Sequence, residues 1–227
     1  MKKAGAPFVF IGCIELLEDV GLRAQSEREL IERLEEVPAG SIFYHTYGYF
    51  LRHRYFVGPY ANDFATWAVV HLRDQMLGER LAVVDPFEFD TLEQLREELI
   101  SVIDDHLSHL SAVPRADYGE PFYFVQSHVV EVPTGHEAWG LEEFRGCLAD
   151  VDASAIYYHL VEARARLGRR SGDFAAWLRE SLSRPDLAEH VERIDLYLSS
   201  LERVRARVLN LLVEAIEQAE EAYQEPT

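Results

Sequence analysis

The chain has few basic residues and almost no cysteine. Its 227 residues include 22 Lys and Arg against 40 Asp and Glu, which gives a formal net charge of −18. Because such a surface repels phosphate backbones and anionic lipid headgroups, we expect no binding of nucleic acid and no membrane surface site. The two cysteines, Cys13 and Cys147, fit neither a disulfide framework nor a metal motif. They favour a reducing, cytoplasmic compartment.

Long apolar runs and common catalytic motifs are also missing. No apolar run reaches the roughly 18 residues of a membrane-spanning helix. The sequence has no Gly-x-Ser-x-Gly turn, no phosphate-binding loop and no dinucleotide-binding glycine pattern. We therefore predict no cofactor and favour a protein that is not an enzyme; these absences count against the common enzyme classes and leave an unusual enzyme as the alternative. With 48% hydrophobic residues, the chain can still bury a sizeable core.

The most informative feature is an internal repeat. Three segments of the first half recur in the same order in the second half, with only short deletions between them. The matches are Pro7 with Pro121, Ile42–His45 with Ile156–His159, and Asp63–Trp67 with Asp173–Trp177. We therefore predict a tandem duplication, with a first repeat over residues 7–113, a linker over 114–120 and a second repeat over 121–223.

The predicted fold is mainly α, or α+β if the short strands that open the repeats are real. Phe8–Leu16 and Phe122–Val132 are rich in aromatic and β-branched residues, which favours strands. Gly21 and Gly135 are expected to mark the turns that follow. The two pseudo-symmetric repeats are then filled by helices.

Capping patterns and apolar spacing predict where the helices of the first repeat begin. Ser26–Glu29 and Thr91–Gln94 are capping-box patterns. Between them, residues 41–54 are expected to form one helix, with His45 on its apolar face.

Polar residues shared by the repeats are candidates for chemistry. A histidine and two acids could ligate a metal or act as acid and base. The candidate catalytic residues are His45, Asp63 and Glu79, with counterparts at His159, Asp173 and Glu189. The alternative is structural: a hydrogen-bonded core histidine, an aspartate that caps a helix, and a solvated glutamate. We commit to no metal site, and we interpret Asp105–His109 as a solvated helix end, where the second repeat has Ala215 and Gln218.

Aromatic residues gather in the first repeat beside arginine and histidine. Such a group can bind a small ligand, form an interface or lie in the core. The candidate ligand-binding residues are Tyr44, Tyr49, Arg52, His53 and Tyr55.

The repeat resembles a known family. The motifs that carry the resemblance are Ser41-Ile42-Phe43-Tyr44-His45, Asn62-Asp63-Phe64-Ala65-Thr66-Trp67 and Gly78-Glu79-Arg80-Leu81. They are similar to the DUF5752 family, whose function is unknown. The second repeat departs from the motif, with Gly172 in place of Asn62 and Ala188 in place of Gly78. The resemblance implies a setting near trehalose-synthase-like glycosyltransferases, and hence a link to carbohydrate metabolism.

Two functions remain open on this basis. The first is a non-enzymatic cytosolic module that binds a protein partner, a second copy of itself or a small ligand, and so regulates carbohydrate metabolism. The alternative is a metal-dependent or acid–base enzyme that uses the His/Asp/Glu group of the first repeat.

Overall fold

The chain combines helices with a sheet of two long strands. The computed structural model describes residues 3–111, 116, 119–164 and 171–224. Helices make up 57% of the structure, and two antiparallel strands form the sheet. The fold is therefore α+β, and the prediction of a mainly α fold with short opening strands is wrong.

The strands continue well beyond the predicted segments. β1 runs over Phe8–Ala24 and β2 over Phe122–Ala138, each 17 residues long. Gly21 and Gly135 do not end them, because each lies inside its strand with a φ of 76°. Glycine adopts this left-handed conformation at little cost, and it bends a strand without ending it. The prediction of a turn at these glycines is thus corrected to a distortion within each strand.

The chain divides into two compact units, and each unit takes part of both strands. The first, which we call the His45 unit, comprises Glu15–Val130. The second, the His159 unit, comprises Met1–Ile14 and Glu131–Thr227. The opening residues of β1 therefore belong to a different unit from the helices that follow β1. The compact units and the sequence repeats are different divisions of the same chain.

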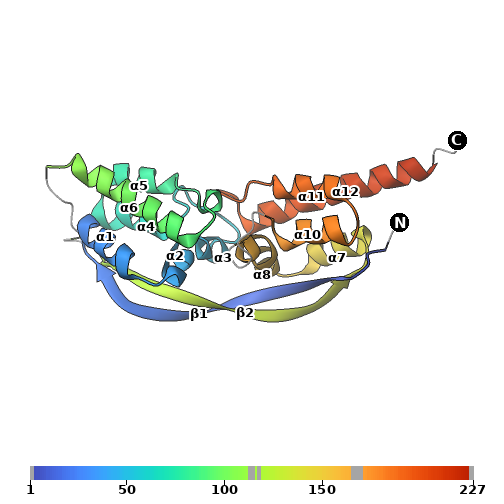
Figure 1. Ribbon diagram of the computed structural model, residues 1–227, viewed down its shortest axis with the longest axis horizontal. Helices are drawn as coiled ribbons and strands as arrows, with labels where there is room; N and C mark the ends of the chain where they lie inside the picture. Colours follow the sequence, from blue (N-terminus) through green and yellow to red (C-terminus); the bar gives the residue numbers. More distant parts are fainter. Residues whose placement is uncertain (1–2, 112–115, 117–118, 165–170, 225–227) are drawn as a thin grey trace. The chain divides into compact units, whose positions relative to one another are not determined.

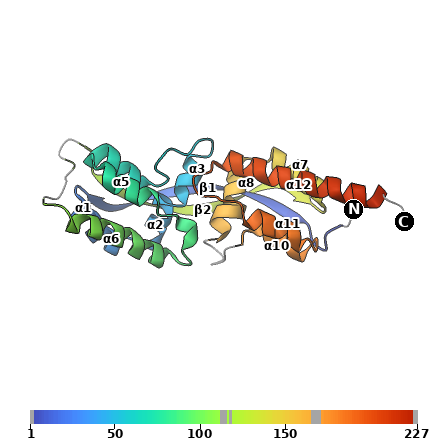
Figure 2. The ribbon, with the colours of Figure 1, turned by 90° about the horizontal axis from the view of Figure 1, so that it is seen from above.

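In the His45 unit, helices cover one face of the strand segments (Figures 1 and 2). The helical elements are α1 (Glu27–Glu36), α2 (Ala39–His45), α3 (Gly48–Arg52), α4 (Asp63–Trp67), the π-helix η1 (Ala68–Leu72), α5 (Gln75–Ala82), the 3₁₀ helix η2 (Pro86–Glu88) and α6 (Leu92–Ser108). The helix predicted over residues 41–54 is in fact two helices. Thr46, at the end of α2, turns its hydroxyl back to the Ile42 carbonyl, a bond that competes with regular helix.

The His159 unit contains a similar series of helical elements (Figure 1). They are α7 (Leu141–Asp150), α8 (Ala153–Ile156), the π-helix η3 (Tyr157–Glu162), α10 (Asp173–Glu180), α11 (Pro185–Glu192) and α12 (Leu201–Gln224).

Alternate residues of each strand enter an aromatic core. In the His45 unit, Phe122 and Phe124 of β2 are buried, and Phe122 stacks on Phe64 with ring centroids 5.0 Å apart. In the His159 unit, Phe8 of β1 packs edge-on against Phe174 at 5.3 Å. Successive strand residues point to opposite faces, so these buried aromatic residues mark the one face of each strand that the helices cover.

An arginine holds the end of a helix in both units, buried at Arg96 and partly exposed at Arg205. Arg96 on α6 donates to the carbonyls of Leu34 and Val37, where α1 ends. Arg205 on α12 donates to the corresponding carbonyls at the end of α7. Carbonyls at a helix C-terminus lack partners within the helix, so these bonds fix how the two helices meet. The predicted capping box of Thr91 and Gln94 is confirmed.

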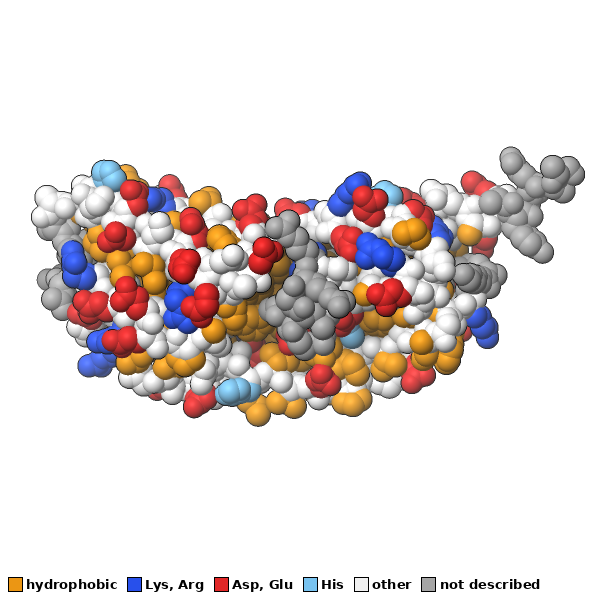
Figure 3. Space-filling view, viewed as in Figure 1, with side chains coloured by type: hydrophobic (Ala, Val, Ile, Leu, Met, Phe, Trp, Pro, Cys, Tyr) orange, Lys and Arg blue, Asp and Glu red, His pale blue; other side chains and the backbone are white. Residues whose placement is uncertain are grey.

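Acidic side chains are spread over the visible surface of each unit instead of forming one patch (Figure 3). Among the described residues, none of the helices has both the length and the apolar character needed to cross a membrane.

Candidate functional site

The central feature of the His45 unit is a buried histidine bonded to an aspartate. His45 ends α2, and Asp63 begins α4. Their Nδ1 and Oδ2 atoms lie 2.8 Å apart, and His45 is only 4% exposed. Asp63 was interpreted as the helix cap, but the cap is Asn62, whose side chain accepts from the Ala65 N–H. The Asp63 carboxylate is thus free to face the histidine.

The other ring nitrogen of His45 is also engaged. The Val125 N–H on β2 donates to His45 Nε2 at 3.1 Å. Nε2 must then be the acceptor, so Nδ1 carries the proton that it donates to Asp63. Burial lowers the pKa of His45 from its ordinary value and so favours the neutral ring, although the Asp63 carboxylate acts in the opposite direction. The interpretation of His45 as a hydrogen-bonded core histidine is confirmed.

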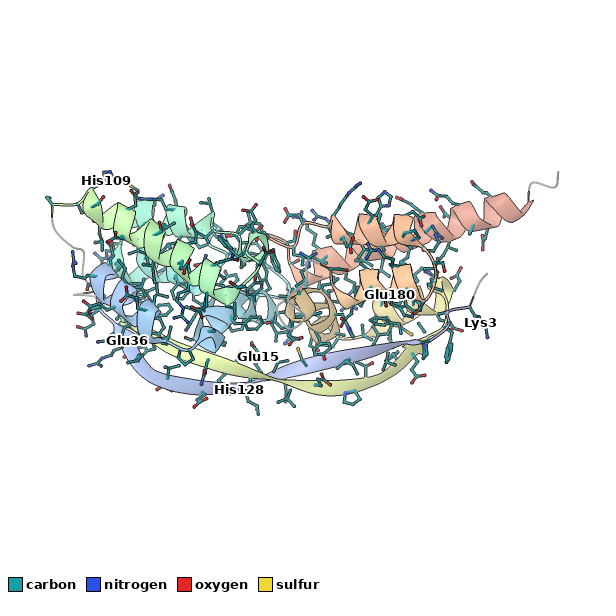
Figure 4. All side chains as sticks on the ribbon, in the orientation of Figure 1. Lys3, Glu15, Glu36, His109, His128 and Glu180 are labelled. Atoms are coloured by element: carbon teal, nitrogen blue, oxygen red, sulfur yellow. The ribbon has the colours of Figure 1, made fainter. Side chains whose placement is uncertain are left out.

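A polar group surrounds the Asp63 carboxylate. Arg52 bonds to Asp63 at 2.5 Å and to the Tyr44 carbonyl at 2.9 Å. Glu15 on β1 accepts from the Ser127 hydroxyl, and its burial raises the pKa of its carboxyl. Figure 4 shows Glu15 on the strands.

A glycine at position 48 gives this group room. A Cβ on Gly48 would lie 3.1 Å from both Arg52 and Glu15 Oε1, tighter than ordinary side-chain contacts. Gly48 thus leaves room for the two charged side chains to approach the same point of α3.

The His159 unit contains the same histidine arrangement. His159 Nδ1 lies 2.8 Å from Asp173 Oδ2, and Nε2 accepts from the Ile11 N–H at 2.9 Å. In each unit, therefore, a helix-borne histidine links an aspartate to the backbone of a strand. The same hydrogen-bond arrangement occurs in both units, which is typical of a bond with a structural role.

Glu79 does not join this pair. It is exposed on α5, where its Oε1 accepts from Gln75 at 2.8 Å. Within the described residues, His45, Asp63 and Glu79 do not form a group of converging metal-binding atoms.

The candidate ligand-binding residues fall into two sets. Tyr44 and Tyr49 are buried: Arg52 lies 4.0 Å above the Tyr44 ring, and His53 stacks on Tyr49 at 3.8 Å. Tyr55, by contrast, is 73% exposed. The first four residues thus belong to the packed structure around α3, and Tyr55 is available at the surface.

The exposed set extends to two neighbouring residues of the same aromatic group in the sequence. Phe56 is 75% exposed, and the Arg54 guanidinium lies over the Tyr55 ring at 5.9 Å. We call Arg54, Tyr55 and Phe56 the aromatic loop.

A second polar cluster lies elsewhere in the same unit. Ligand atoms from Glu27, Asp74 and His106 all lie within 4.8 Å of one another. Sequence analysis noted only His106, as part of a solvated helix end, but it is 3% exposed. A signal was available for Glu27, because the repeat alignment places this charged residue opposite Leu141.

The fold and its paired histidine ties define a class of α+β proteins built on two long strands. The chain belongs to the family of unknown function DUF5752, whose model matches residues 5–213. It is similar to a solved structure described as OrfY from Thermoproteus tenax, with 28% identity and a TM-score of 0.81. That match covers 95% of this chain and 98% of OrfY. No curated protein matches the chain.

Proposed function

We propose that the chain is a non-enzymatic, cytoplasmic regulatory module that docks on a protein partner through the aromatic loop. The observation that carries this proposal is the exposure of Tyr55 and Phe56, at 73% and 75%. Large aromatic side chains and arginine dominate the binding energy of protein interfaces. Adjacent exposed rings beside Arg54 match that composition.

The geometry at His45 favours binding over acid–base catalysis. Both ring nitrogens are engaged, one with Asp63 and one with a backbone N–H. A general base needs a free nitrogen within reach of a substrate proton. Glu79, the third residue of the alternative site, bonds instead to Gln75 at the surface.

The proposal includes a tandem duplication in which the two halves have diverged. Support comes from the matching histidine ties and from the matching arginines Arg96 and Arg205. The aromatic loop belongs to the first repeat. We also propose that the partner is an enzyme of carbohydrate metabolism, as the family resemblance implied.

A capture experiment tests the docking surface. The purified chain is immobilised and exposed to native lysate as wild type, as a Tyr55→Ser/Phe56→Ser variant and as a Met76→Ser/Val83→Ser control. The control removes aliphatic side chains that are 66% and 77% exposed in the same unit. We expect wild type and control to retain a sugar-metabolising enzyme that the loop variant loses.

Two outcomes contradict the proposal. If all three forms retain the same proteins, or if none retains a specific one, the loop is not a docking surface. A stoichiometric metal that is lost in a folded His45→Ala variant favours the enzyme alternative. The activity of the captured enzyme, measured with and without the chain, then tests regulation.

A further inference from the structure

The Glu27–Asp74–His106 cluster joins three helices of the His45 unit. Glu27 is the first residue of α1, after the cap Ser26. Asp74 caps α5, where its Oδ1 accepts from the Leu77 N–H at 2.8 Å. His106 lies near the end of α6, and its Nε2 is 3.0 Å from Asp74 Oδ2.

The cluster is buried, and its glutamate lacks a hydrogen-bond partner. Glu27 is 0% exposed, and neither of its carboxylate oxygens has a hydrogen-bond partner among the described residues. The side chain of Asp74 is 14% exposed. Two adjacent carboxylates removed from water repel each other unless a cation or a proton compensates them. In agreement, burial and the nearby Asp74 raise the pKa of Glu27 to about 7.

The distances suit a shared metal ion. Structural Zn²⁺ binds nitrogen and oxygen ligands at about 2.0–2.2 Å in a tetrahedral arrangement, so two of its ligand atoms lie about 3.4 Å apart. The separation of His106 Nε2 and Asp74 Oδ2 is 3.0 Å. The ligand atoms of the three residues lie within 4.8 Å of one another, so small side-chain rotations bring all three groups to one ion. The bond from the Leu77 N–H orients Asp74 and leaves its Oδ2 for the ion.

The fold does not itself require this cluster. In the His159 unit, the first residue of α7 is the buried Leu141, and the position that matches His106 is the buried Ala215. The residue that caps α11, Arg184, pairs with Asp186. Buried apolar residues and a surface ion pair are therefore enough to hold the helices together at the matching positions of the His159 unit. The fold alone does not explain why the His45 unit has Glu27, Asp74 and His106 there.

We propose that Glu27, Asp74 and His106 bind one divalent transition-metal ion, Zn²⁺ or Mn²⁺, which ties α1, α5 and α6 together. Imidazole favours Zn²⁺, and paired carboxylates also suit Mn²⁺. Water completes the coordination. The ion is structural, because two of its ligands are buried, the third is 14% exposed, and the three hold the ends of α1, α5 and α6.

Metal titration tests the site. The full chain is stripped with a chelator and titrated with ZnCl₂ or MnCl₂, with stoichiometry from elemental analysis and affinity from calorimetry. We expect one ion per chain. Glu27→Leu and His106→Ala introduce the residues of the matching positions, so both variants should fold, as circular dichroism will show. Each should weaken binding by about 100-fold or more.

The matched control is His109→Ala, which removes an exposed histidine at the end of the same helix (Figure 4). Its affinity should equal that of wild type. At about 100 times the dissociation constant, the ion should raise the ratio of folded to unfolded chain about 100-fold in wild type and in the control only. The proposal is overturned if wild type binds no ion at about 1 mM. Equal affinities of wild type and the Glu27→Leu/His106→Ala double variant would also overturn it.

Discussion

Replacing Glu27 with glutamine tests whether this carboxyl is held out of water, independently of any metal. Glu27→Gln keeps the shape of the side chain and removes its charge. The measurement is made with excess EDTA, so that no ion compensates the carboxylate. Asp74 and His106, the titratable groups that share the cluster, are present in both proteins, and their coupling to the Glu27 charge is part of the measured difference.

The magnitude follows from the pKa of Glu27, which burial and then Asp74 raise from 4.5 to about 7. Between these values the folded chain keeps a proton that the unfolded chain has released. Since the native state binds more protons in this window, its stability falls as pH rises from 4.5 to 7. The shift corresponds to about 3 kcal/mol in the free energy of unfolding. The free energy of unfolding of the wild type should therefore fall by this amount relative to that of Glu27→Gln. The full difference should be reached above the pKa that Glu27 has in the folded chain.

Urea unfolding followed by circular dichroism measures the difference at about pH 4.5 and about pH 8. At the lower pH most of this fall in stability has not yet occurred, so the two proteins should have similar free energies of unfolding. At the higher pH the variant should be more stable by about 3 kcal/mol. If the units unfold separately, the change should be confined to the transition of the His45 unit. A stability difference that is the same at both pH values would refute a desolvated Glu27 carboxyl.

Three further changes test the rest of the structure. His45→Ala should lower the free energy of unfolding by about 2–3 kcal/mol, because Asp63 keeps Arg52 but loses the histidine, and the part-buried Val125 N–H loses its acceptor; an unchanged urea midpoint contradicts the structural tie. Arg96→Met should cost about 2–3 kcal/mol and speed amide exchange in α1, whose terminal carbonyls lose their donor; unchanged exchange speaks against that bond. The Tyr55→Ser/Phe56→Ser variant should change stability by less than about 0.5 kcal/mol, and a larger loss by calorimetry would mean that the rings are part of the core.

Local patterns predicted the elements whose stability is local. The Thr91 capping box is readable because its donors and acceptors lie within four residues. The burial of His45 follows from its position on an apolar helix face. The strand lengths were not readable, because the later parts of β1 and β2 are largely exposed and lack a continuous apolar pattern. Their pairing with each other, a long-range contact, holds them extended.

The site depended even more on tertiary structure. Asp63 was a reasonable helix cap by position, but Asn62 takes that role and leaves Asp63 to His45. Glu27 has the ordinary sequence context of a first-turn acid, which is normally exposed and favourable. Only the packing of α1 and α5 on α6 buries it beside Asp74. Sequence spacing carries no information about such a meeting of distant segments.

A comparison of the two units distinguishes features that support the fold from features that the fold only tolerates. The histidine–aspartate tie and the arginine bonded to a helix end occur in both, as expected of bonds that support the fold. The Glu27 cluster occurs once, and Leu141 and Ala215 at the matching positions are buried without it. Burying a carboxylate where leucine suffices weakens a protein unless something binds there. The positions at which the units differ are therefore where binding function is to be sought, and the histidines shared by both are not.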